Sequence, residues 1–471
     1  MSLNSILYLL FLTLVSIVYY LINQNQRKYL LILASFIFIG FKNMESVLVL
    51  ILTIIITYSL AKKIQSTIEI KRRKNLLRIG IVNSLAILFL FKYFDFHGEN
   101  VFKMENIFFA LGISFYTLQN ISFLVEVHSK RLKLDLNLVD FTVYSSFFPK
   151  FIMGPIALAQ DFFPQINDTK FQSENILIGF KRILVGLVKK IVIADSLSTY
   201  VHFNFDMDNP TTGLTSLITA YLFTLQLYFD FSGYSDIALG SAKILRYDLK
   251  ENFTFPLRSV SITEFWRNWH ISLTSWLTKY IFYPISYRLR KLKKIAIPIA
   301  LLITFLLSGL WHGIGFTFLI YAVSHALYMC FEYFTKSVRL KLATKIPFKI
   351  HQFISIFITF NLVSLSFVFF RANSIDTAIH FIKAIFNFNH FIPANWNLDF
   401  YSQLAITGDQ FSFFNLLSLI IITIIFLLFE KKIFQLSINN KANYIFLFTL
   451  IFLLFVFGIY SNSEQFIYNQ F

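Results

Sequence analysis

The chain has 471 residues, of which 56% are hydrophobic and only 14% are charged. Soluble domains carry about 25% charged residues, so this composition excludes an ordinary soluble enzyme and indicates a protein embedded in a lipid bilayer. The net charge of +17 lies in short basic clusters between apolar runs, a pattern that reflects membrane topology and argues against nucleic-acid binding.

Twelve apolar runs follow one another along the chain, and most approach the ~20 residues that a membrane-crossing helix needs. The runs are 5–22, 28–41, 46–61, 76–92, 106–127, 183–200, 213–242, 296–312, 314–334, 351–370, 413–430 and 444–461. The first run lacks a basic start and a small-residue cleavage site, so we interpret it as a retained span. The pattern predicts an all-α polytopic membrane protein with about 11–12 transmembrane helices, forming a single domain over residues 1–471.

The loops between these runs predict the orientation. Lysine and arginine crowd the segments 62–74, 288–294 and 336–349, whereas the loops around 206–208 and 373–410 lack this excess. Basic loops stay on the cytoplasmic side of a membrane. We therefore expect a plasma (inner) membrane protein whose two termini both lie outside.

Two stretches do not fit simple spans. Residues 141–160 are apolar but contain Pro149, Gly154 and Pro155, which break a helix. Residues 261–287 are rich in aromatic side chains yet carry several charged and polar ones. Irregular or polar backbone at membrane depth survives only inside protein or beside a water-filled cavity. Both stretches predict re-entrant or interfacial helices around a central tunnel.

His312 is the clearest candidate for chemistry, because it lies deep in the apolar run that begins near residue 295. An ionisable side chain at membrane depth is costly and is usually functional. Imidazole also exchanges protons readily near neutral pH. Unusual polar residues are concentrated from Gln226 onward, in the segments 226–236, 262–273 and 307–313, the last of which contains His312.

These segments resemble the membrane-bound O-acyltransferases, in the bacterial branch that O-acetylates polysaccharides such as alginate and peptidoglycan. The likeness is strongest over residues 110–371. Besides the segments around His270 and His312, it rests on the strings Phe115–Gln119, Gly154–Ile156, Lys189–Asp195, Phe229–Asp236 and Phe370–Ala372. Each string alone is weak, but their order and spacing together are specific.

The resemblance implies that His312 is the family's membrane histidine and that His270 is a second functional residue. It also implies acetyl-CoA as the acyl-donor substrate, with no permanently bound cofactor. The acceptor side would involve an exported acetyltransferase or esterase-like partner protein and a cell-envelope polysaccharide. The teichoic-acid D-alanylation branch shares the Trp-His strings, but Gly233–Asp236 is closer to the acetylation branch, which we rank first.

Several residues have simpler interpretations. His270 could orient the other histidine instead of reacting, and Glu264 with Arg267 could form only an ion pair. We expect His325 to be a core residue, and we leave Asp236 and Arg371 open between structural and functional roles. The single cysteine, Cys330, excludes an intramolecular disulfide and a cysteine-ligated zinc site. No carboxylate stands at ligand spacing beside His270 or His312, so we predict no metal site.

The chain ends in an aromatic tail, residues 461–471, in which Phe466-Ile467-Tyr468 resembles a motif that carries a tyrosine acyl acceptor in related systems. Tyr468 is therefore either an acyl relay or an interfacial anchor. A polysaccharide-precursor transporter is the main alternative from another class, although many transporter folds show an internal repeat that we do not find here. A non-catalytic scaffold for a secretion complex is a third alternative.

Overall fold

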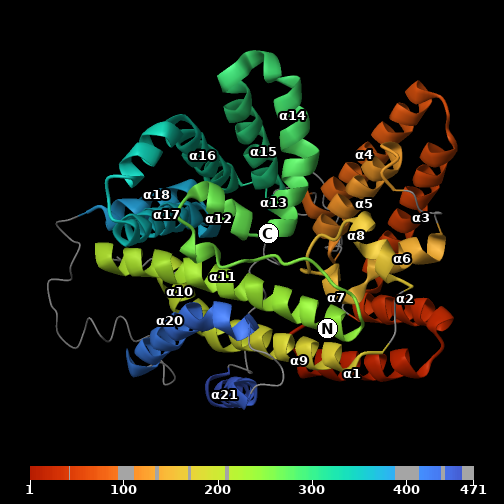
Figure 1. Cartoon of the computed structure of the whole chain (residues 1–471), viewed down its shortest axis with the longest axis horizontal. Coiled ribbons are helices and arrows are strands. Elements are labelled where there is room, and N and C mark those ends of the chain that lie inside the picture. Colours follow the sequence, from red (N-terminus) through yellow and green to blue (C-terminus); the bar gives the residue numbers. More distant parts are fainter. Residues whose placement is uncertain are drawn as a thin grey trace, which may run out of the picture. The chain divides into compact units, whose positions relative to one another are not determined.

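The computed structural model describes residues 1–41, 43–93, 111–132, 137–167, 171–206, 212–313, 315–387, 413–435 and 441–458. Within these residues every regular element is a helix, which confirms the predicted all-α fold (Figure 1). Every predicted apolar run coincides with helix in its described part. Four described segments are both long and apolar enough to cross a membrane, namely Met44–Ser66, Ile70–Lys92, Arg290–His312 and Phe348–Arg371. The number of crossings and the outside location of both termini stay predictions.

The described helices form two compact units, residues 1–186 with 234–251 and residues 187–233 with 252–471. The first unit contains α1 (Ile6–Leu21), α2 (Gln24–Gly40), α3 (Met44–Ser66), α4 (Ile70–Tyr93), α5 (Ile113–His128), α6 (Leu138–Ser146), α7 (Phe148–Phe151), α8 (Ala159–Phe162), most of α9 (Ser173–Leu187) and the end of α11 (Gly213–Ile244). In it, α3, α4 and α5 lie side by side (Figure 1). Helices α9 and α11 meet at two glycines: a Cβ on Gly240 would lie 2.5 Å from the carbonyl oxygen of Gly179.

The second unit contains the π-helix η3 (Val188–Ala194), α10 (Asp195–Asp206), most of α11, α12 (Ile262–Asn268), α13 (Ile271–Leu277), the π-helix η5 (Thr278–Phe282), α14 (Tyr283–Arg288), α15 (Ala296–His312), α16 (Phe316–Ala343), α17 (Phe348–Arg371), α18 (Ile375–Ile385), α20 (Phe413–Gln435) and α21 (Lys441–Phe457). Helix α16 packs against both α15 and α17, and the short α12 packs against α16 and α17. His270 directly follows α12 and Trp269, and His312 is the last residue of α15, so this packing holds both predicted histidines.

Both stretches that were predicted to break do so. Residues 141–160 fold as the short helices α6 and α7 and the start of α8, and Pro149 occupies the first turn of α7. Residues 261–287 fold as α12, α13, η5 and most of α14. Helices α13, η5 and α14 follow one another without a break from Ile271 to Arg288. None of the helices in the two stretches is among the four segments that are both long and apolar enough to cross a membrane.

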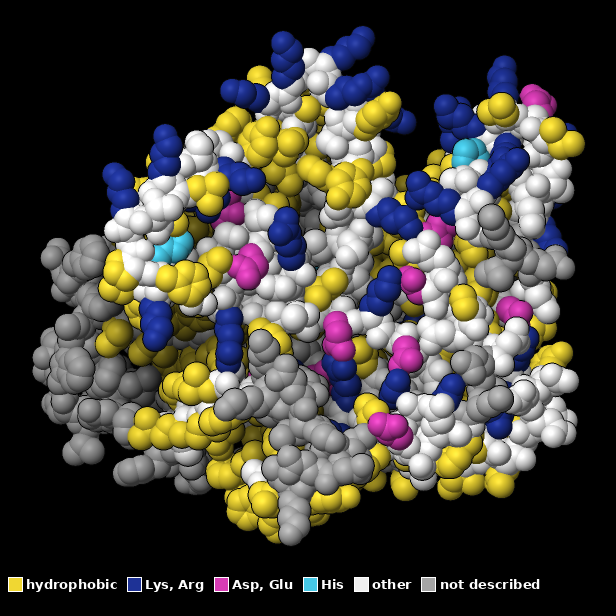
Figure 2. All heavy atoms as spheres, viewed as in Figure 1, with side chains coloured by type: hydrophobic (Ala, Val, Ile, Leu, Met, Phe, Trp, Pro, Cys, Tyr) yellow, Lys and Arg dark blue, Asp and Glu magenta, His cyan; other side chains and the backbone are white. Residues whose placement is uncertain are grey.

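Apolar side chains cover much of the outer surface, as expected of a protein solvated by lipid. Large hydrophobic residues such as Leu14, Leu52, Phe331 and Phe353 are more than half exposed. Lysine and arginine side chains gather at the free end of the α14–α15 hairpin and, in the other unit, at the free end of the α3–α4 hairpin (Figure 2). The positive-inside rule predicts that such basic ends lie in the cytoplasm, which stays a prediction here.

Candidate active site

His312 is the last residue of α15, and only 4% of it is exposed. Two glycines in the same string bring α15 against α16. A Cβ on Gly309 would lie 2.8 Å from the Cβ of Ala322, and one on Gly313 would lie 2.4 Å from the ring of Phe318. Helix α15 ends in an ordinary way, with the Gly313 N–H donating to the Gly309 carbonyl. The two glycines are thus needed because the helices touch there.

His270 lies in the break between α12 and α13, and only 1% of it is exposed. Its backbone is left-handed, with φ 42° and ψ 54°, a conformation that is uncommon outside glycine and is often found at functional sites. Helices α12 and α13 are not among the four candidate membrane spans. Burial lowers the pKa of the His270 imidazole, so the ring is neutral at pH 7.

The aromatic ring of Trp311 packs against both histidines. Its centroid is 4.9 Å from that of His312 and 6.3 Å from that of His270. Phe231 of α11 packs 4.6 Å from His270, and Phe370 of α17 packs 5.3 Å from His312. Four of the strings that carry the family resemblance therefore meet at this one place.

A cavity of about 1110 Å³ opens beside this cluster, within the second unit. Its inner wall includes Trp266, Thr304 and Ser308, and Ser308 lies one helical turn before His312. Ile271, the residue after His270, also lines it. The rim carries basic side chains, namely Arg267, Lys279, Lys336 and Arg339. Neither histidine lines the cavity itself, but its wall comes within one residue of His270, at Ile271, and within one helical turn of His312, at Ser308. Its size fits a large organic ligand.

Helix α16 holds α12 at two places. The indole N–H of Trp266 donates to Nδ1 of His325 over 3.2 Å, and His325 is fully buried. The carboxylate of Glu332 accepts the backbone N–H groups of Ile262 and Thr263 at 2.7 and 3.0 Å. His325 is a core residue, as predicted, and it also fixes Trp266 as a wall of the cavity. The capping role of Glu332 left no recognisable sequence signal, because 69 residues separate it from Thr263.

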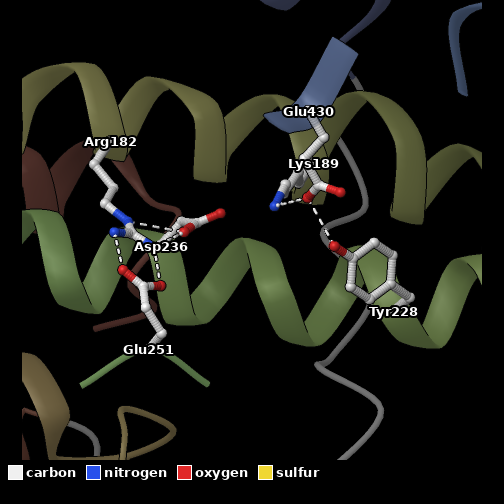
Figure 3. Close-up of polar contacts among 6 residues, drawn as sticks. All are labelled: Arg182, Lys189, Tyr228, Asp236, Glu251 and Glu430. Atoms are coloured by element: carbon white, nitrogen blue, oxygen red, sulfur yellow. Dashed lines mark hydrogen bonds and ion pairs between the residues drawn. The ribbon is translucent and has the colours of Figure 1, made fainter. Parts of the chain in front are cut away.

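The lysines of the Lys189–Asp195 string form buried ion pairs. Nζ of Lys189 lies 2.7 Å from Glu430 of α20, whose carboxylate also accepts the hydroxyl of Tyr228 (Figure 3). Nζ of Lys190 lies 2.6 Å from Asp195 and 2.8 Å from Asp230. Each of these two lysines thus neutralises buried carboxylates, and we interpret the string as part of the packing between helices.

The residues whose roles the sequence did not decide lie in different environments. Asp236 accepts Nε of Arg182 at 2.9 Å in the first unit, and Arg182 also pairs with Glu251 (Figure 3). Glu264 accepts the N–H of Val260 at 2.9 Å, and its own N–H donates to the N-cap Ser261. The guanidinium of Arg371 lies over the ring of Phe205. Tyr468 and the tail 461–471 lie outside the described residues.

Comparisons with known proteins identify the family of this chain. A family model for the membrane-bound O-acyltransferases matches residues 7–372. The probable alginate O-acetylase AlgI of Pseudomonas aeruginosa is 32% identical over 421 residues, which cover 86% of this chain and 78% of that protein. The peptidoglycan O-acetyltransferase of Helicobacter pylori is 30% identical over 402 residues, covering 78% and 75%. The teichoic acid D-alanyltransferase of Bacillus subtilis is 30% identical over 268 residues, covering 55% and 68%.

The family match spans more than half of the chain and includes His270, His312, the cavity and the strings that meet at the two histidines. The fold and the apolar helices are those of a multi-pass membrane protein. This chain therefore belongs to the membrane-bound O-acyltransferase family, and it is a membrane O-acyltransferase.

Proposed function

We propose that this enzyme takes an acetyl group from cytoplasmic acetyl-CoA and passes it across the membrane for O-acetylation of a cell-surface or extracellular polysaccharide. The observation that carries the proposal is the cavity that joins a basic rim to the neighbourhood of His270 and His312. The similarity to alginate and peptidoglycan O-acetylating proteins over most of the chain supports the same reaction.

The cavity has the chemistry that coenzyme A needs. Lys279, Lys336 and Arg339 at the rim can bind the nucleotide phosphates, because cations form strong hydrogen bonds with phosphate oxygens. The inner wall is mostly apolar, with the hydroxyls of Thr304 and Ser308 near its end, which suits the thin pantetheine arm. The thioester would then lie close to His312 while the nucleotide stays at the cytoplasmic mouth.

The reaction needs a base and little else. In our proposal His312 accepts the proton of an acceptor hydroxyl, whose oxygen forms a new bond to the thioester carbonyl carbon. The C–S bond then breaks, and the leaving thiolate takes up the proton. General-base assistance of this kind contributes about 10²–10⁴-fold. His270 would orient the acyl group or donate a hydrogen bond to the developing oxyanion.

D-alanyl transfer to teichoic acid is the alternative within the same fold. The D-alanyltransferase of Bacillus subtilis matches 55% of this chain, against 86% for the alginate O-acetylase of Pseudomonas aeruginosa. The wider match favours acetyl transfer, and a transporter is disfavoured because the chain belongs to an acyltransferase family.

The proposal includes a direction and an exported partner. Basic segments such as 62–74 and 336–349 would face the cytoplasm, and both termini would lie outside the plasma membrane. An exported acetyltransferase or esterase-like protein would then receive the acetyl group. Cysteines placed at 336–349 should be shielded from an impermeant thiol reagent in intact cells, whereas cysteines at 385–410 should react. Reaction at the first site would reverse the direction of transfer.

Tyr468 is the proposed relay residue on the outer side. A phenol with a pKa near 10 needs a positioned base to act as a nucleophile at neutral pH. Tyr468→Phe should therefore block polysaccharide acetylation while thioester hydrolysis persists. Unchanged acetylation would leave the tail as a membrane anchor.

The donor is tested directly with purified protein in detergent, radiolabelled acetyl-CoA and a D-alanyl thioester in parallel. Transfer or hydrolysis of acetyl-CoA alone supports the proposal, and turnover of only the D-alanyl thioester overturns it. Lys336→Gln should raise the KM for acetyl-CoA about three- to tenfold, because one phosphate contact is lost. Lys345→Gln is the matched control, since Lys345 is equally basic but does not line the cavity.

A further inference from the structure

We infer that Asn252 is the positioning residue that sets the orientation of His270. The inference rests on the proposed function only for the role of His270 in transfer. Asn252 lies outside every string that carries the family resemblance, 18 positions before the histidine in the chain. Its exposure is 1%, so its side chain is fixed inside the protein.

The break at His270 is not stabilised by the histidine itself. His270 is the N-cap of α13, but its side chain makes no capping hydrogen bond. The first N–H groups of a helix need partners from outside that helix. His270 also adopts a left-handed backbone, which is unfavourable for a residue with a Cβ. Another part of the chain must therefore hold this geometry.

Asn252 supplies what the N-cap lacks. Its backbone carbonyl accepts the N–H of Ile271 at 2.8 Å. Its side-chain Oδ1 accepts the N–H of Ser272 at 3.3 Å and the Ser272 hydroxyl at 2.6 Å. Three donors that directly follow His270 thus end on one residue. Because these donors fix the first turn of α13, they fix the direction in which the His270 side chain leaves the backbone.

The same loop also holds the other side of the break. The N–H of Thr254 donates to the carbonyl of Asn268 at 3.0 Å, two residues before His270. The segment 252–254 therefore clamps the chain on both sides of the histidine, and the imidazole is left facing Phe231 and Trp311. Of these contacts, only those of Oδ1 depend on the identity of a side chain, which is why Asn252 is the residue to change.

The test compares Asn252→Ala with Asn252→Asp in the acetyl-transfer assay. Alanine removes the acceptor, and we expect kcat to fall about 10- to 100-fold, because small misplacements of a reacting group have effects of this size. The KM for acetyl-CoA should stay within about twofold. Aspartate keeps an oxygen at Oδ1, at a helix N-terminus that favours negative charge, so it should restore most of kcat. Asn268→Ala is the control, since its side chain contacts Ser259 and not α13.

A double variant separates positioning from general damage. If Asn252 acts through His270, Asn252→Ala should not lower the activity of a His270→Ala protein further. A second loss of 10- to 100-fold in that background would overturn the inference.

Amide hydrogen exchange gives a readout that needs no substrate. Exchange at residues 271–273 should become faster in Asn252→Ala, and it should return to the wild-type rate in Asn252→Asp. Unchanged exchange in the alanine variant would overturn the role of Asn252. A wild-type protein that transfers no acetyl group would instead overturn the proposed donor, and the exchange rates would still decide whether Asn252 holds the break.

Discussion

The two candidate catalytic histidines, His270 and His312, are held in opposite ways. His312 ends a regular helix, α15, and the backbone hydrogen bonds of that helix determine where its side chain begins. His270 lies in a helix break with left-handed backbone, and its neighbours are held by Asn252 and by α16. Both imidazoles nevertheless face the same tryptophan, Trp311.

This difference predicts which kinds of substitution should displace each histidine. The position of His312 depends on the close packing of α15 on α16, so added volume should disturb it. The position of His270 depends on polar contacts with distant residues, so the loss of a hydrogen bond or an ion pair should disturb it. The following variants test this division.

The largest effect is expected from His312→Ala. Loss of the proposed base should reduce acetyl transfer by about 10²–10⁴-fold, while the protein still inserts into the membrane, because α15 keeps its own backbone hydrogen bonds. The measurement is transfer of radiolabelled acetyl groups by equal amounts of purified protein. Near wild-type transfer by a normally expressed variant would contradict the central role of His312.

Breaking the Lys189–Glu430 ion pair should lower the stability of the protein and disturb the packing around His270. Tyr228 donates to Glu430, and its ring lies 6.2 Å from that of Trp269, the neighbour of His270. Lys189→Met leaves a buried carboxylate without this lysine and should lower the free energy of unfolding by about 3–5 kcal/mol. The double variant Lys189→Met/Glu430→Gln should recover much of this loss in thermal unfolding experiments. A double variant as unstable as the single one would show that the pairing is not the cause.

A larger side chain at Gly313 should disturb the packing of α15 on α16 next to His312. In Gly313→Ala the new Cβ would lie within 2.4 Å of the Phe318 ring, and overpacking of this kind costs about 1–3 kcal/mol of stability. Acetyl transfer should fall as well, because the end of α15 moves. Gly315→Ala is the matched control: its nearest neighbour is 3.4 Å away, so stability and transfer should stay close to wild type. Equal losses in the two variants would argue against close packing as the reason for Gly313.

The smallest effect is expected from a comparison of two His270 variants, which tests the role of the backbone conformation apart from that of the imidazole. His270→Ala and His270→Gly both remove the ring, and both should lose transfer. Glycine accepts the left-handed backbone, so the glycine variant should be about 1 kcal/mol more stable than the alanine variant. Thermal unfolding of the two proteins measures this difference. An alanine variant at least as stable as the glycine variant would mean that the left-handed conformation at 270 is not retained.

Much of this site could be predicted from sequence because its signals are local or strongly patterned. The apolar runs predicted helices, since a lipid-embedded backbone must satisfy its hydrogen bonds within each segment. Pro149 predicted an interruption that the structure contains. His312 stood out because an imidazole inside an apolar run is costly.

Tertiary structure decided the rest, because the partners are far apart in the chain and of ordinary residue types. Nothing in the sequence links Asn252 to Ser272, Glu332 to Thr263, or Glu430 to Lys189. Each of these contacts satisfies a buried donor or charge that the local segment cannot satisfy alone, and only the packed helices bring the second group within reach. The sequence by itself determined which segments are helical, and it singled out His270 and His312 as candidate site residues. The direction in which His270 points, and the cavity that leads toward it, were decided by the way the helices pack.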